Sequence, residues 1–135
     1  MGGYWLMKIA GIDVGTTGSK IVVFDHDLGV QIDKEYVPYA SKHQNGSREI
    51  SATDLTEAIY TLINNISKRH PDIKGIGITS FGESFVLLDE QDKPLRDIML
   101  YTDVRGTEEC QTLVKKIGVD KIRKITGLNP SPMYS

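Results

Sequence analysis

The segment that most constrains the fold runs from Ile9 to Lys20 and continues directly into the apolar run Ile21–Phe24. An apolar stretch ends at Asp13, small and hydroxyl-bearing residues follow, and β-branched residues resume at Ile21. Apolar, β-branched runs on both sides of a glycine-containing turn are typical of paired strands. The sequence therefore predicts a strand, a tight turn and a second strand.

The predicted turn has the residues of an anion-binding loop. Gly15 and Gly18 are expected to adopt backbone angles closed to other residues, so that successive N–H groups converge on an anion. Three hydroxyl side chains and one cation could add further contacts to phosphate: Thr16, Thr17, Ser19 and Lys20. Asp13 would repel a phosphate, and its expected place is on a Mg²⁺ ion that bridges the two anions.

The order of elements excludes two common phosphate loops. A P-loop needs a Gly-Lys-Ser/Thr ending and a following helix, and a dinucleotide-binding turn also leads into a helix. Here a strand follows the turn. The loop instead resembles the first phosphate loop of the actin-like ATPase superfamily, which includes sugar kinases, chaperone ATPases and actin; an ordinary glycine-rich hairpin is the alternative.

Composition narrows the class of protein. The net charge is −2 and no basic stripe is visible, so a nucleic-acid partner is not expected. The single cysteine, Cys110, excludes an internal disulfide and fits a reducing compartment. No apolar run approaches the length of a membrane span and no signal peptide is recognisable, so we expect a cytoplasmic protein without a membrane partner. Residues 1–6 are interpreted as an upstream extension or a cloning remnant.

The remaining chain predicts an α/β domain. A helix should begin at Ser51 or Thr53, because apolar residues then recur at helical spacing up to Ile66. Residues 73–79 are apolar enough for a strand buried on both faces, and residues 40–51 are interpreted as a surface loop with a turn at Asn45-Gly46. The other expected elements are strands at 7–13, 19–26, 30–39, 85–88 and 98–101 and helices at 107–118 and 120–126. This order predicts a mixed sheet with a β-meander, parallel strands and flanking helices, the ribonuclease-H-like half of the actin-like fold.

Three later motifs make the resemblance more specific. Gly77-Ile78-Thr79 lies at the end of a predicted strand, Asp103-x-Arg105 follows a short apolar strand, and Thr126-Gly127-Leu128 precedes Pro132. Together with the loop, this order resembles the FGGY carbohydrate kinases, which phosphorylate xylulose, ribulose, gluconate or glycerol. The resemblance covers residues 7–135 and implies the N-terminal domain of such a kinase.

The resemblance assigns roles by matching position. The loop would hold the phosphates of ATP, with Asp13 on Mg²⁺. The acceptor sugar would be contacted by two later segments: Phe81, Gly82, Glu83, Tyr101, Asp103 and Arg105. Each has a plainer alternative. Glu83 could be a solvated loop carboxylate, Tyr101 a core edge, and Phe81 a core residue, while Asp103 and Arg105 could form a salt bridge that shapes a helix start.

Departures from the family pattern bear on the acceptor. Glycerol-type kinases carry an Arg-Glu pair where this chain has Gly82-Glu83, and a Tyr where it has Met133. Loss of the Arg removes a bidentate donor for polyol hydroxyls, so glycerol is not the expected substrate. The xylulose-type segment Gln-Met-His-Gly is also absent. A carboxylate at Glu83 can accept from two hydroxyls of a vicinal diol, and a ketopentose such as xylulose is our expectation.

The expected activity is transfer of the γ-phosphate of ATP to a sugar hydroxyl. The resemblance places the catalytic base and the adenosine pocket further along such a kinase, so the chain alone is expected to show no turnover. Two alternatives remain open: a chaperone-like or activator ATPase of the same superfamily, and a non-catalytic sugar-binding module. The oligomeric state is also open, a homodimer of the full-length protein being one option.

Overall fold

The computed structural model describes residues 7–133, and the interpretation of residues 1–6 lies outside the described part of the chain. The chain divides into two compact units. The first contains the residues up to Ala40 together with Ser51–Phe81, and the second contains Ser41–Ile50 and the residues from Gly82 onward.

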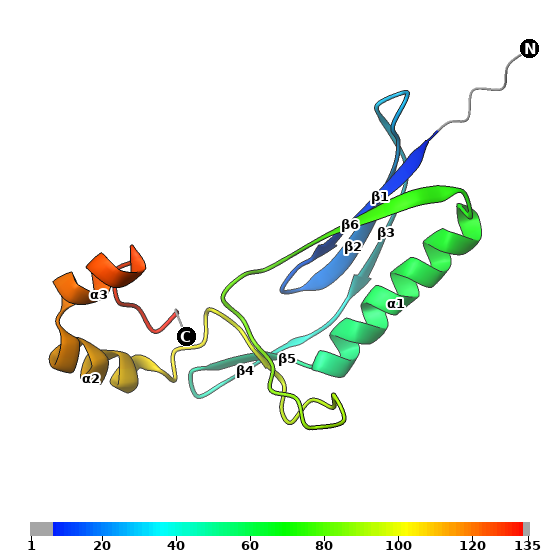
Figure 1. Ribbon diagram of the computed structural model, residues 1–135. Helices are drawn as coiled ribbons and strands as arrows, with labels where there is room; N and C mark the ends of the chain where they lie inside the picture. Colours follow the sequence, from blue (N-terminus) through cyan, green and yellow to red (C-terminus); the bar gives the residue numbers. More distant parts are fainter. Residues whose placement is uncertain (1–6, 134–135) are drawn as a thin grey trace, which may run out of the picture. The chain divides into compact units, whose positions relative to one another are not determined.

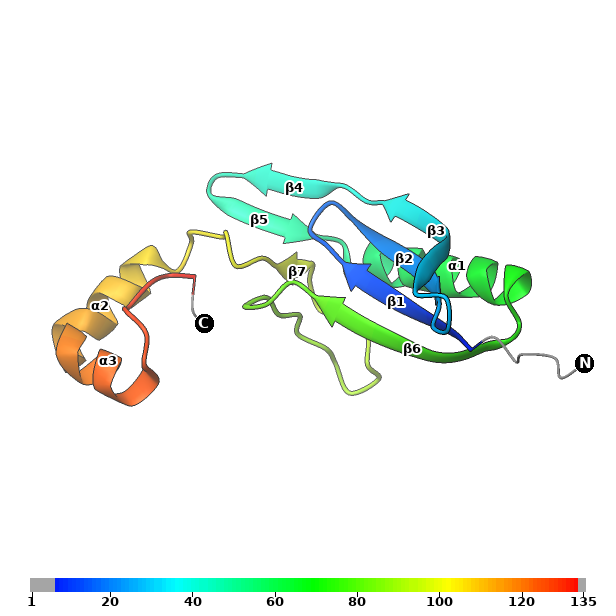
Figure 2. The same ribbon diagram turned by 90° about the horizontal axis from the view of Figure 1, so that it is seen from above.

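The first unit is built on a four-stranded mixed sheet with the order β3-β2-β1-β6. Its strands are β1 (Lys8–Val14), β2 (Gly18–Asp25), β3 (Val30–Pro38) and β6 (Ile73–Ser80). The first three form an antiparallel meander, and β6 lies parallel to β1. The predicted meander, parallel strand and mixed sheet are therefore confirmed (Figure 2).

Helix α1 (Ala52–Arg69) covers one face of this sheet, as Figure 1 shows. Ser51 is the N-cap, because its side chain accepts a hydrogen bond from the Asp54 N–H at 3.1 Å. Leu62 and Ile66 of the helix are fully buried with strand residues. The core cluster consists of Ala10, Ile12, Val14, Ile21, Val23, Leu62 and Ile66. Helical spacing of apolar residues thus produces the packing that the sequence predicts.

The expectation that strand 73–79 is buried on both faces is wrong. β6 is exposed from Lys74 to Ser80, and the side chain of Ile78 is 66% accessible. The reason is its place at the edge of the sheet, while α1 packs against β2 and β3. The apolar run correctly predicted a strand, but it did not predict that the strand is exposed.

The second unit contains a small antiparallel sheet where a loop was expected. β4 (Ser41–Gln44) and β5 (Ser47–Ile50) form a hairpin, and β7 (Ile98–Met99) pairs with β5 (Figure 2). The turn falls at Asn45 (φ 48°) and Gly46 (φ 84°), as expected. Successive positive φ values with Asn-Gly are characteristic of a two-residue hairpin. The loop assignment of residues 40–51 was therefore wrong, although its turn was located correctly.

The rest of the second unit contains two helices and long irregular segments. α2 (Thr107–Ile117) and α3 (Val119–Thr126) agree with the predicted helices, and Gly118 separates them at φ 87°. Residues 85–88 do not form a strand; they contribute only isolated bridges from Phe85 to Met99 and from Leu88 to Pro94. Among the described residues, no helix is long and apolar enough to cross a membrane.

Candidate functional site

The turn between β1 and β2, in the first unit, contains the residues predicted to bind phosphate. The Gly15 N–H donates to the Gly18 carbonyl at 3.0 Å and closes the turn. Neither glycine has a positive φ, so the expected reason for glycine is wrong. The requirement is steric instead: a Cβ at Gly18 would overlap the Tyr36 ring, and a Cβ at Gly15 would lie 3.0 Å from the Gly18 carbonyl oxygen.

The loop presents donors that its own fold does not use. Within residues 7–133, no group accepts a hydrogen bond from the backbone N–H of Thr16 or Thr17. Both residues are at least partly exposed. By contrast, the carbonyl of Gly15 accepts from the Tyr39 hydroxyl, and the carbonyl of Thr17 accepts from the Tyr36 hydroxyl. The loop therefore has open donors and occupied acceptors, the arrangement that suits an anion.

Asp13 and Lys20 flank this loop as cross-strand neighbours. The Lys20 Nζ lies 3.5 Å from Asp13 Oδ2, and about half of each side chain is exposed. Among the described residues, no group of three or more potential protein ligands could hold a metal alone. A single exposed carboxylate nevertheless fits Mg²⁺, which keeps several waters and is bound through one or two carboxylates and substrate phosphates.

Ser19 has a different environment from its neighbours. Its side chain is fully buried, and its Oγ lies 3.2 Å from the Tyr39 hydroxyl oxygen. A buried hydroxyl with this partner is poorly placed to contact a phosphate arriving from solvent. The structure thus offers no support for the predicted direct contact.

Glu83 has an unusual backbone conformation in the second unit. Its φ is +54°, and the only other described residues of this kind outside glycine are the turn residues Asn45 and Asp92. Asn and Asp tolerate the left-handed region, whereas a glutamate there is uncommon and deserves a functional hypothesis. Its neighbour Gly82 is exposed, and nothing lies within 4 Å of a Cβ built there.

Asp103 is buried and its carboxylate is already used by the chain. It accepts from the Arg48 N–H at 2.8 Å and from the Arg105 backbone and guanidinium, with Arg105 Nη2 at 2.6 Å. Arg105 also contacts Glu49 at 2.7 Å. The Arg105 hydrogen bonds lower the pKa of Asp103 from 3.8 to about 2. Asp103 and Arg105 therefore form a salt bridge, which is the predicted alternative to a sugar contact.

The two aromatic candidates lie in different units. Phe81 packs against the core cluster of the first unit. Tyr101 belongs to the second unit, where its backbone N–H donates to the Ser84 hydroxyl at 3.1 Å. The loop residues lie in the first unit. The other residues predicted to contact the sugar, from Gly82 onward, lie in the second unit.

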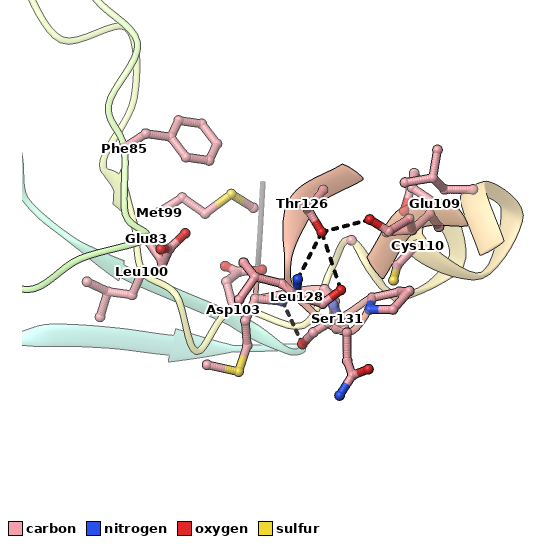
Figure 3. Close-up of a pocket in the computed structure, with 17 residues that line it drawn as sticks. Glu83, Phe85, Met99, Leu100, Asp103, Glu109, Cys110, Thr126, Leu128 and Ser131 are labelled. Carbon is pink, nitrogen blue, oxygen red and sulfur yellow. Dashed lines mark hydrogen bonds between the residues drawn. The ribbon is translucent and has the colours of Figure 1, made fainter. Parts of the chain in front are cut away.

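A pocket of about 570 Å³ lies within the second unit, a size typical of small-molecule sites (Figure 3). Glu83 and Asp103 line it, whereas Gly82, Tyr101 and Arg105 do not. Sequence reasoning did not single out most of the lining residues, which include Phe85, Met99, Cys110, Leu113 and Ile122. Helical spacing of Cys110 and Leu113 was the signal that could have indicated a shared inward face.

Comparison with solved structures identifies the fold as that of the actin-like ATPases. Two similar structures show this. A glycerol kinase from Plasmodium falciparum with ADP is 25% identical, with a TM-score of 0.88, over 96% of this chain and 27% of that chain. A xylulose kinase from Brucella ovis is 26% identical, with a TM-score of 0.82, over 95% and 27% of the two chains.

The family follows from the sequence match. The FGGY family of carbohydrate kinases, N-terminal domain, matches residues 8–135. The chain belongs to this family. A glycerol kinase from Streptomyces avermitilis is 32% identical over 126 residues, which cover 89% of this chain and 24% of the relative. The chain thus spans about a quarter of the length of the curated relatives it matches.

Proposed function

We propose that this chain is the N-terminal domain of an ATP-dependent kinase that transfers the γ-phosphate of ATP to a hydroxyl of a sugar or polyol. The observation that supports this most directly is the β1–β2 turn, where no described residue accepts from the N–H groups of Thr16 and Thr17 and where Asp13 pairs with Lys20. Phosphoryl transfer depends chiefly on positioning and charge neutralisation. Open donors, a cation and a carboxylate are the groups that such a reaction needs around the phosphates.

Each loop residue has its own part in binding and neutralising the phosphates. The N–H and hydroxyl groups of Thr16 and Thr17 donate to phosphate oxygens, and the absence of a side chain at Gly15 lets the phosphate approach the backbone. Lys20 adds positive charge at the β2 side of the loop. Asp13, whose carboxylate is about half exposed and lies 3.5 Å from Lys20 Nζ, would hold Mg²⁺, and the ion would neutralise phosphate charge.

For the acceptor, we propose a ketopentose such as xylulose. Glu83, which lines the pocket and has a positive φ, would accept hydrogen bonds from a vicinal diol. Tyr101 stays a predicted sugar contact, whereas the packing of Phe81 against the core cluster of the first unit fits its plainer alternative. Asp103 and Arg105 form the salt bridge described above, so they shape the wall of the pocket rather than offering a free acceptor to the sugar. Glycerol is the second candidate, because curated relatives at this level of similarity are named glycerol kinases.

The test is Mg·ATP-dependent ADP release by the full-length protein with a panel of ketopentoses, pentitols, gluconate and glycerol. We expect turnover with one ketopentose, and a fall of at least about a hundredfold in kcat/KM for Asp13→Asn. Glu83→Ala should raise the acceptor KM and leave the KM for ATP unchanged. ATP hydrolysis that ignores every sugar would contradict the proposal and favour a chaperone-like or activator ATPase. Sugar binding without any Mg·ATP binding would favour a non-catalytic module.

A further inference from the structure

Two buried hydroxyl groups lie directly behind the phosphate loop and have no part in the function proposed above. The Tyr39 hydroxyl lies 2.5 Å from the Gly15 carbonyl oxygen and 3.2 Å from the Ser19 Oγ. Tyr39 is 9% exposed and Ser19 is 0% exposed. All three residues belong to the first unit, so their arrangement depends on that unit alone.

The directions of these hydrogen bonds follow from the number of protons. A carbonyl oxygen can only accept, so the single proton of the Tyr39 hydroxyl is donated to Gly15. The Tyr39 oxygen can then only accept from Ser19, whose hydroxyl is the donor. The order is Ser19 O–H to Tyr39 O–H to the Gly15 carbonyl, a chain in which each bond polarises the next.

The final acceptor is connected to the loop through a peptide bond. The Gly15 carbonyl and the Thr16 N–H belong to the same planar peptide unit, and in a trans peptide they point in opposite directions. No cis peptide bond occurs among the described residues. Fixing the carbonyl toward Tyr39 therefore turns the Thr16 N–H away from Tyr39. Withdrawal of electron density through the carbonyl also makes that N–H a stronger donor.

The burial of Tyr39 and its backbone hydrogen bond to the loop stabilise this chain of hydrogen bonds. Burial raises the pKa of the Tyr39 hydroxyl above its ordinary value of 10.0, so the proton stays on at neutral pH. The Tyr39 backbone N–H also donates to the Thr17 carbonyl at 3.3 Å, which ties the same residue to the loop at a second point. Removal of one partner would leave the buried hydroxyl of the other without its hydrogen bond, at a cost in free energy.

We propose that Tyr39 and Ser19 are positioning residues for nucleotide binding, which orient and polarise the Thr16 N–H toward a phosphate oxygen. Ser19 thus acts through Tyr39 rather than by touching phosphate. This inference rests on the proposed function only in naming the ligand as a nucleotide phosphate. The orientation of the peptide can be measured without any ligand.

The test uses the full-length protein and the variants Tyr39→Phe and Ser19→Ala, with Mg·ADP as the probe. In Tyr39→Phe we expect about a fivefold weaker Kd for Mg·ADP, the usual effect of one hydrogen bond, and an unchanged acceptor KM. Without nucleotide, the Thr16 amide resonance should shift in the same variant. Because Ser19 acts through Tyr39, Ser19→Ala should weaken binding alone but add nothing to Tyr39→Phe.

Controls separate positioning from stability. Tyr60→Phe removes an exposed hydroxyl from α1 and should leave the Kd and the Thr16 resonance unchanged. Leu62→Ala lowers stability through the core and should leave the Kd of the folded protein unchanged. A Tyr39→Phe protein with wild-type Kd, or additive effects of the two variants, would overturn the inference. Failure of wild-type protein to bind Mg·ADP would instead overturn the proposed function, and it would be seen before any variant is made.

Discussion

At the scale of single residues, Gly18 shows how a loop can require glycine for reasons of space. Its φ is ordinary, but a Cβ there would overlap the ring of Tyr36. Tyr36 in turn donates its hydroxyl to the Thr17 carbonyl at 2.9 Å. The ring covers the base of the loop because glycine leaves room for it.

Gly18→Ala should therefore destabilise the protein by roughly 1–3 kcal/mol, the usual cost of overpacking. The loss should be measured by chemical denaturation. In a Tyr36→Ala background the same change should cost less than about 0.5 kcal/mol, because the overlapping ring is gone. Gly11→Ala is the matched control, since nothing lies within 4 Å of a Cβ at that strand position. An equal loss at Gly18 in both backgrounds would contradict this explanation.

Asp103 predicts a pH dependence of stability. Its folded-state pKa of about 2 lies below the ordinary 3.8, because Arg105 favours the charged form. The stabilisation is therefore complete above about pH 4 and is lost as the pH falls toward 2. Asp33, held by Arg69 and His70, also has a pKa of about 2 and contributes in the same window.

The difference between two proteins isolates the Asp103 contribution. Thermal unfolding of the wild type and of Asp103→Asn should be measured from pH 6 to pH 2. The wild type should be more stable at pH 6, and the two curves should converge toward pH 2. A constant gap over the whole range would show that the loss in Asp103→Asn is unrelated to ionisation.

At the scale of elements, the start of α1 can be tested directly. Ser51 and Thr53 were both predicted caps, and the hydrogen bond from Asp54 selects Ser51. Ser51→Ala should lower the free energy of unfolding by about 1 kcal/mol, whereas Ser51→Asp should retain most of it. Thr53→Ala should have little effect on chemical denaturation. Equal losses at both positions would contradict the assignment of a single cap.

The elements also show where sequence reasoning succeeds. α1 and the meander were predictable because apolar residues repeat at a clear period, and the turn at Asn45-Gly46 was visible from its chemistry. The β4–β5 hairpin was missed because Lys42, His43 and Gln44 are all exposed. Without a buried face there is no alternation to detect. The burial of β6 was overestimated for a related reason, since composition does not reveal a place at a sheet edge.

Some features of the candidate site could also be predicted from the sequence, and others could not. Loop residues 13–20 were predictable because glycine, hydroxyl and charged residues lie together in the sequence. The hydrogen bond from Tyr39 to the Gly15 carbonyl was not, because it depends on β3 returning to the loop across the meander. Likewise, the engagement of Asp103 by the Arg48 N–H joins β5 to a distant segment of the chain.

At the scale of the whole molecule, acceptor choice is the property to test. The sequence resemblance predicts that Gly82 stands where glycerol-type kinases carry Arg, and nothing lies within 4 Å of a Cβ built at Gly82. Gly82→Arg should raise kcat/KM for glycerol relative to xylulose by about tenfold, because a guanidinium supplies charge-assisted hydrogen bonds to hydroxyls. Gly82→Ala is the control and should leave the ratio unchanged. A stable Gly82→Arg protein with the wild-type ratio would argue against a polyol contact at this position.

The parallel pairing of β1 with β6 has a consequence for how the chain acquires its fold during synthesis. Ile12 lies opposite Ile21 within a short hairpin, but its other neighbour is Ile78. At typical translation rates of roughly 5–20 residues per second, that partner emerges from the ribosome several seconds after Ile12. Loop closure over such a separation is also entropically costly. One edge of β1 therefore waits unpaired while the meander is already able to form, and that interval is when a nascent chain most needs protection from wrong strand partners.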